Sequence, residues 1–171
     1  MIAGPTFAGI PVTQRGAAES FMVCTGVGRQ GKEVKLPGYE RSRTLVILMG
    51  VARLPQVLET LLSSNISPSR RGGSAYPSHT PIALIERASM PDQRVVCATL
   101  DSISAAMESV GEQRPPGMIV IGWSILSLWG DGDMKILDDG AEDLDEARVR
   151  GWLGDTRWRV VEGLDAGWNS V

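Results

Sequence analysis

The feature that most constrains the fold is Leu45–Met49, a continuous apolar run that ends at Gly50. A short apolar run that stops at a turn residue is typical of a β-strand buried on both faces. Beyond Gly50 the apolar residues recur three or four positions apart, at Val51, Leu54, Leu58, Leu61 and Leu62. This spacing predicts a helix, and Pro55 falls in its first turn, where a missing N–H costs nothing.

Met49 and Gly50 therefore stand at the carboxyl end of a predicted central strand. Ligands of open α/β sheets bind beyond the carboxyl ends of strands, and a glycine there lets a flat ligand approach the backbone closely. The two residues are candidates for ligand binding. The alternative interpretation is an ordinary strand-to-helix corner.

Four further apolar segments predict the other strands of the sheet: Ser20–Thr25, Ile82–Ser89, Gln93–Leu100 and Met118–Ser127. The turn residues Pro91 and Asp92 predict a hairpin between the middle two, and Gly122 predicts a bend in the last. A helix is predicted over Ser102–Val110, with Asp101 as its N-cap. This order of elements predicts an α/β fold, with a mixed sheet flanked by helices.

Composition narrows the classes of protein that fit. The chain has 171 residues, a net charge of −3 and no sustained basic run, which argues against nucleic-acid binding. We expect no membrane span and no secretory signal, because no long apolar segment or charged leader is present. Cys24 and Cys97 are isolated within apolar runs, so we expect two reduced core cysteines in a cytoplasmic protein.

Gly26–Gly31 spells G-x-G-x-x-G directly after a predicted strand. A dinucleotide site needs a helix to open inside this motif, so that the helix N-terminus meets the pyrophosphate. The residues that follow, Glu33–Tyr39, contain a Pro-Gly pair and do not predict a helix. The motif is therefore interpreted as a mobile glycine-rich loop that carries Arg29 and Lys32.

Two other polar features carry weaker signals. His79 is the only histidine and has no Cys, Asp or Glu at ligand spacing, so we expect a solvated loop residue and no metal site. The Arg70-Arg71 pair fits either an anion clamp or a flexible hydrophilic turn.

The last part of the chain is acidic from Asp131 to Glu146, and Lys135 breaks the carboxylate spacing of a calcium loop. We expect a solvated acidic linker, followed by a short helix over Ala147–Leu153. Tryptophans follow at Trp152, Trp158 and Trp168, which give this tail apolar surface with which it can dock.

Several short runs resemble, in order, the tetrapyrrole methylase family. They are AGIPVTQRG at Ala8–Gly16, Thr25-Gly26, TLVILMG at Thr44–Gly50, TPIALIERAS at Thr80–Ser89 with Gln93-Arg94, and PPGMIVIGW at Pro115–Trp123. They cover roughly Thr6–Trp129 and are most similar to the C-terminal half of uroporphyrinogen-III C-methyltransferases of sirohaem synthesis, of fungal type. Gln14 and Val27 depart from the pattern, since the family has histidine there.

The resemblance implies transfer of methyl groups from S-adenosylmethionine to uroporphyrinogen III, giving precorrin-2, by an enzyme that forms a homodimer. By matching motifs, Met49, Gly50 and Ala88 would contact the cofactor, and Arg15 would face the carboxylates of the substrate. Arg29, Lys32 and Arg53 are further candidates for those carboxylates. No catalytic side chain is predicted, because an activated methyl donor and an electron-rich carbon need mainly alignment.

The resemblance also implies a division of the chain. Residues 1–19 would be the remnant of an interdomain helix and linker, residues 20–129 the C-terminal α/β domain, and residues 130–171 an acidic, tryptophan-containing tail. The family's N-terminal domain, which supplies half of the cofactor cleft, is not in this sequence, so we expect cofactor binding to depend on that half. Two alternatives stay open: a non-catalytic dimerisation module, and a sister methylase of the diphthamide type that acts on a protein histidine.

Overall fold

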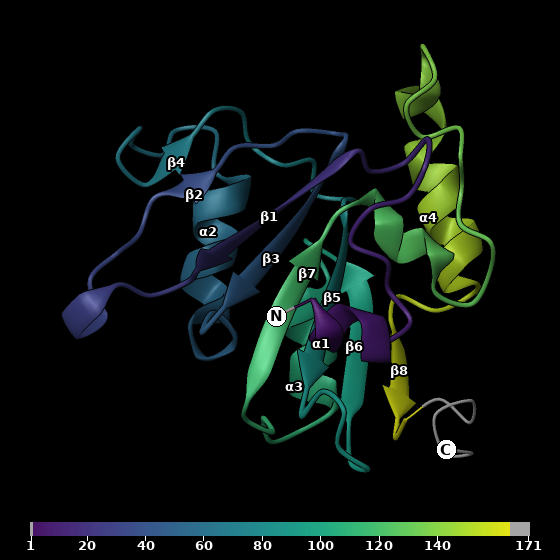
Figure 1. Ribbon diagram of the computed structural model, residues 1–171. Helices are drawn as coiled ribbons and strands as arrows, with labels where there is room; N and C mark the ends of the chain where they lie inside the picture. Colours follow the sequence, from purple (N-terminus) through teal and green to yellow (C-terminus); the bar gives the residue numbers. More distant parts are fainter. Residues whose placement is uncertain (1, 165–171) are drawn as a thin grey trace.

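The computed structural model describes residues 2–164 and contains a six-stranded mixed sheet (Figure 1). In spatial order the strands are β1 (Ser20–Thr25), β3 (Arg43–Leu48), β7 (Gly117–Ile121), β5 (Pro81–Glu86), β6 (Arg94–Thr99) and β8 (Arg159–Glu162). The β1–β3 pair is parallel and every other neighbouring pair is antiparallel. The predicted α/β fold with a mixed sheet, including the β5–β6 hairpin, is confirmed.

Helices cover both faces of this sheet. They are α1 (Ala3–Phe7), α2 (Leu54–Leu62), α3 (Ile103–Ser109) and α4 (Asp145–Leu153), with short 3-10 turns η1 (Arg29–Gly31), η2 (Val51–Arg53), η3 (Trp123–Ser127) and η4 (Ala141–Leu144). A separate two-stranded sheet pairs β2 (Leu36–Pro37) with β4 (Arg71–Gly72). The strand–glycine–helix unit predicted around Gly50 is confirmed, with Pro55 in the first turn of α2.

The core has one layer on each face because strand side chains alternate. On one face, strand residues such as Ile47 and Leu84 pack against α2 and α3. On the opposite face, Val46, Ala83 and Ile85 pack beneath the segment that follows α1. Both layers are apolar, so the central strands β3, β5 and β7 are buried on both faces.

Two local predictions are wrong. The strand expected over Met118–Ser127 ends at Ile121, because Gly122 has a φ of 137° and turns the chain into η3. Asp101 does not cap α3. The residue before that helix is Ser102, and Asp101 instead accepts a hydrogen bond from the Thr99 hydroxyl.

The G-x-G-x-x-G segment opens no α-helix. It forms the single turn η1 and then runs extended into β2, as the sequence predicts. No helix within residues 2–164 is both long and apolar enough to cross a lipid bilayer.

The acidic segment is more ordered than predicted. Most of its carboxylates are exposed, but Asp145 is only 2% exposed and pairs with Arg41. His79 is only partly solvated: its side chain is 32% exposed, but its Nε2 is buried and lies 3.6 Å from the Asp145 Oδ2. The predicted helix is present as α4, and Trp152 stacks on Trp129.

The three-part division of the chain stays a prediction. Strand β8 pairs with β6 across the boundary drawn after residue 129, so part of the tail belongs to the same sheet as residues 20–129. Trp158 packs partly against the α2–α3 layer. Trp168 lies outside the described residues.

Candidate functional site

The carboxyl ends of β3 and β5 lie at the same edge of the sheet. Both strands run antiparallel to β7, which lies between them, so both end where β7 begins. Met49 follows β3, Ala88 follows β5, and Pro116 immediately precedes β7. Three segments far apart in sequence therefore meet at one edge, as ligand sites of α/β sheets require.

A hollow of about 400 Å³ opens at this edge beneath α1, and we call it the α1 hollow. Met49, Ala88 and Ser89 line it from the sheet edge, and Gly4 and Phe7 line it from α1. Its other walls are apolar, and no charged residue lines it. This surface suits an apolar or cationic ligand rather than an anionic one.

A second hollow of about 690 Å³ lies on the other side of Met49, and we call it the loop hollow. It is lined by Val51 and Ala52 from η2 and by residues 112–117 of the loop before β7, together with Glu86. Met49 lines both hollows and is 61% exposed between them.

The backbone at this edge is in a rarely populated conformation. Met49, Arg87 and Ser89 have φ values of 55°, 51° and 68°, in the left-handed region that non-glycine residues seldom adopt. The Arg87 N–H donates to the Pro116 carbonyl at 2.8 Å, which ties the turn after β5 to the start of β7. Such strain concentrates at functional sites, where the surrounding structure holds it in place.

Comparison with known proteins identifies the family. A family profile described as Tetrapyrrole (Corrin/Porphyrin) Methylases matches residues 1–104. The chain belongs to the tetrapyrrole methylases. Its fold is also similar to a solved cobalt precorrin-4 methyltransferase, with 18% identity and a TM-score of 0.50, over 72% of this chain and 48% of that one.

Two curated tetrapyrrole methylases show how much of a relative this chain represents. It is 36% identical over 124 residues to a "Probable uroporphyrinogen-III C-methyltransferase" of Schizosaccharomyces pombe, covering 72% of this chain and 23% of that protein. It is 37% identical over 123 residues to the "Uroporphyrinogen-III C-methyltransferase" of Methanocaldococcus jannaschii, covering 71% and 47%. The chain thus spans less than half the length of either relative.

Of the predicted cofactor residues of this methylase chain, Met49 and Ala88 line the α1 hollow, but Gly50 lines neither hollow. Gly50 is buried, and a Cβ on Gly26 would lie 2.7 Å from its Cα. A Cβ on Gly50 would itself lie 3.0 Å from Ile119. Close packing against Gly26 and Ile119, rather than contact with a ligand, explains why a glycine stands at position 50.

Arg15 is not brought to the same edge. It is exposed in the loop before β1, which the Glu19 N–H joins to the Ser42 carbonyl at the amino end of β3. Gly16 in the same loop accepts a hydrogen bond from Leu137 of the acidic segment. Arg15 therefore lies toward the edge of the sheet opposite Met49, because β1 and β3 run parallel and both begin at that edge.

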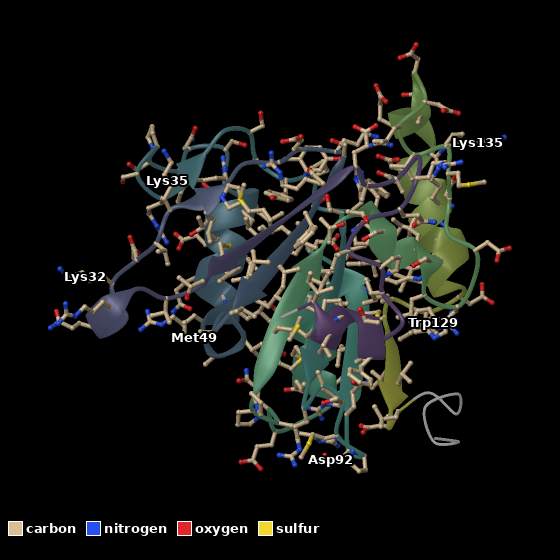
Figure 2. All side chains as sticks on the ribbon, in the orientation of Figure 1. Lys32, Lys35, Met49, Asp92, Trp129 and Lys135 are labelled. Atoms are coloured by element: carbon tan, nitrogen blue, oxygen red, sulfur yellow. The ribbon has the colours of Figure 1, made fainter. Side chains whose placement is uncertain are left out.

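The other predicted cations gather nearer to Met49. Arg29 and Lys32 are exposed in the loop that follows β1, and Arg53 lies against Gly31 of that loop. Figure 2 shows Lys32 and Met49 on the same side of the molecule, away from Lys135. Within residues 2–164 none of these three cations forms an ion pair, so their charges are available to an anionic ligand.

Sequence reasoning missed the contribution of Pro116 and Gly117, which line both hollows. In the sequence these residues stand out only as part of a family motif, because nothing local shows that β7 lies between β3 and β5. The family motif that contains these residues was the available signal. Among residues 2–164 no group of three or more His, Cys, Asp or Glu side chains is arranged to hold a metal ion.

Proposed function

We propose that this chain is part of an S-adenosylmethionine-dependent C-methyltransferase that converts uroporphyrinogen III to precorrin-2 in sirohaem biosynthesis. The observation that carries the proposal is the pair of hollows on either side of strained Met49, in a chain of this family. The relatives named as uroporphyrinogen-III C-methyltransferases support the choice of substrate.

The α1 hollow fits the proposed cofactor. A sulfonium is cationic and an adenosyl group is flat and largely apolar, and the walls of this hollow are apolar and carry no positive charge. We propose that Met49 and Ala88 hold the cofactor and that Gly50 supports the turn on which Met49 stands. When bound, S-adenosylmethionine supplies an activated methyl group, and the protein's task is to orient the methyl acceptor beside it.

We propose that the carboxylates of uroporphyrinogen III bind cations at the edge of the sheet. Arg29, Lys32 and Arg53 are favoured because the loop that follows β1 lies on the Met49 side and because none of the three has an acidic partner in the described part of the chain. Arg15 stays a proposed substrate contact on the evidence of its motif alone. Separate alanine variants of Arg15 and Arg53 test this choice, and we expect the Arg53 variant to lose more substrate affinity.

The protein is further proposed to be a cytoplasmic homodimer. Edge strand β1 carries no charge and no proline, and its Phe21 and Met22 are each 39% exposed. Natural edge strands usually carry charges or prolines that prevent pairing with another chain, so this strand is suited to an interface. Sedimentation of a monomer would contradict the dimer.

The proposed compartment rests on the cysteines. Cys24 and Cys97 are both free thiols, which agrees with a reducing compartment.

Cofactor binding can be tested by NMR of ¹³C-methyl-labelled methionine, because the chain has seven methionines in different surroundings. S-adenosylhomocysteine, the product left after methyl transfer, is titrated to millimolar concentration so that weak binding is also detected. We expect shifts at Met49 and Met118, which line the α1 hollow, and none at exposed Met134. Equal shifts at all three would contradict the proposal, as would the absence of any shift in the longer protein that contains the N-terminal half.

Two variants sharpen this test. Ala88→Leu adds bulk to the wall of the α1 hollow and is expected to abolish the shifts, whereas Ala147→Leu on the exposed face of α4 is expected to leave them unchanged. Methyl-transfer assays of the longer protein with uroporphyrinogen III, and with a histidine-containing protein substrate, separate the main proposal from the diphthamide-type alternative. Binding without any transfer would favour the non-catalytic module.

A further inference from the structure

Gln93 and Arg94 are neighbours at the start of β6, and both are buried, with 2% and 1% exposure. Because successive strand side chains point to opposite faces, the two side chains lie on different sides of the sheet. The Gln93 side faces α1 and the Arg94 side faces α3. Each is therefore next to a different hollow.

Arg94 uses all of its guanidinium nitrogens within the protein. Its Nε donates to the Glu86 Oε2 at 2.6 Å, and its Nη1 and Nη2 donate to the carbonyls of Val110 and Glu112 at 2.8 and 2.7 Å. The other oxygen of Glu86 accepts the Arg114 N–H at 2.9 Å. The buried pair thus holds residues 110–114, which lead into the wall of the loop hollow.

Gln93 makes the corresponding contacts on the α1 side. Its Oε1 accepts the Ser89 N–H at 3.0 Å, and its Nε2 donates to the Phe7 carbonyl at 3.3 Å. Ser89 and Phe7 both line the α1 hollow, one from the turn after β5 and one from α1. A single amide side chain therefore joins two walls of that hollow.

We propose that Gln93 and Arg94 are positioning residues, which fix the walls of the α1 hollow and the loop hollow for the bound ligand. Neither residue lines the loop hollow or the α1 hollow itself, so neither is a ligand contact there. The identity of that ligand rests on the proposed function. The fixing of the walls rests only on the hydrogen bonds. A buried charge at Arg94 is expensive unless it is paired and hydrogen-bonded, and here its Nε donates to the Glu86 carboxylate while Nη1 and Nη2 donate to the two loop carbonyls.

The experiment compares wild type with Arg94→Lys and Gln93→Ala. Lysine keeps the charge opposite Glu86 but cannot reach both loop carbonyls from one nitrogen, so the fold is retained while the wall is released. We expect amides of residues 110–117 to exchange with deuterium about tenfold faster in Arg94→Lys, and those of residues 88–90 about tenfold faster in Gln93→Ala. Affinity for S-adenosylhomocysteine, read from the Met49 shift, should fall about tenfold in both.

Arg71→Lys is the matched control. Arg71 is also buried, at 5% exposure, and its Nη1 donates to the carbonyls of Thr60 and Ser63 at the end of α2, away from both hollows. We expect it to lose stability but to keep wild-type affinity. Gln93→Met keeps the bulk of the side chain but neither hydrogen bond, so it should exchange at residues 88–90 as fast as Gln93→Ala, whereas a role in packing alone predicts wild-type protection.

The outcomes separate this inference from the proposed function. Faster exchange confined to the named walls supports it, and unchanged exchange in both variants overturns it. If Arg94→Lys fails to fold, Gln93→Ala and Gln93→Met decide the matter. If the longer protein that contains the N-terminal half shows no Met49 shift with S-adenosylhomocysteine, the proposed function fails, while the exchange data still decide whether the two residues hold the walls.

Discussion

Arg41 and Asp145 stand 104 positions apart and form a bidentate ion pair, with N–O distances of 2.6 and 2.7 Å. The Arg41 Nε also donates to the Ile136 carbonyl at 2.7 Å, and its guanidinium lies 4.9 Å from the ring centre of Trp123. One arginine therefore fastens two points of the acidic segment, Ile136 and Asp145, to the rest of the fold. This pair explains why a stretch rich in carboxylates is packed rather than free.

Replacing Asp145 with asparagine should destabilise the protein strongly. The Asp145 side chain is 3% exposed, so the change leaves Arg41 without its charged partner in a region that water reaches poorly. We expect the free energy of unfolding to fall by about 3 kcal/mol, at the lower end for broken buried pairs because Arg41 is 21% exposed. Urea denaturation measures this. Asp143→Asn, at an exposed site, is the control, and equal effects in both would contradict the prediction.

Asp133 should make stability depend on pH in the acid range. Burial opposes its ionisation, but the Lys135 N–H and the Arg148 guanidinium outweigh that and lower the pKa of Asp133 below 3.8. Since the folded pKa is the lower one, the contribution of the carboxylate is present above the unfolded pKa and is lost as the pH falls through the folded pKa.

The measurement is the difference in unfolding free energy between wild type and Asp133→Asn across pH. We expect this difference to be largest above the unfolded pKa and to shrink as the pH falls through the lower folded pKa. Asp139→Asn removes the charge of an exposed carboxylate in the same segment and is the control for the loss of charge. A difference that grows as the pH falls would contradict the assignment.

Gly26→Ala should destabilise the turn that supports Met49. The new methyl group would lie 2.7 Å from the Cα of Gly50, and backbone cannot move aside as a side chain can. Overpacking of this kind costs about 1–3 kcal/mol, so thermal unfolding should shift to lower temperature. Gly130→Ala is the control, because nothing lies within 4 Å of its added carbon. An unchanged midpoint of thermal unfolding in Gly26→Ala would show that the turn at Gly26 can move away from the turn at Gly50.

Met49→Asn should increase stability while weakening ligand binding. Met49 is held at a φ of 55°, which asparagine tolerates better, and it is exposed enough to lose little packing. We expect a gain of about 1 kcal/mol in unfolding free energy. Affinity for S-adenosylhomocysteine, followed at Met118, should fall because the side chain between the two hollows is gone. Met134→Asn should change neither quantity, and a loss of stability in Met49→Asn would show that the turn is unstrained.

The sequence predicted the elements near Met49 well and the tail poorly, for a physical reason. The run Leu45–Met49, the glycine after it and the helical spacing beyond are local signals, and the structure reproduces them as β3, η2 and α2. Asp145 and His79 looked solvated because their own neighbours are polar. Their burial depends on Arg41 and Trp123, which are distant in sequence.

The candidate site shows the same division. Met49 and Ala88 could be named from motifs, but Pro116 could not, since its place depends on β7 lying between β3 and β5. The motif made Arg15 the preferred substrate contact and left Arg53 as a further candidate, and only the path of the chain places the two toward opposite edges of the sheet.

By itself, the sequence determined the family, the α/β class and the strand end at which the site is built, because apolar periodicity and glycine turns act over a few residues. Tertiary structure alone decided which residues line the two hollows beside Met49 and which cations lie at the same edge of the sheet. It also decided that Gln93 and Arg94 make their hydrogen bonds on opposite faces of the sheet. Those features depend on strand order and on buried hydrogen bonds between segments up to 86 residues apart, as from Gln93 to Phe7, and no local pattern encodes such pairings.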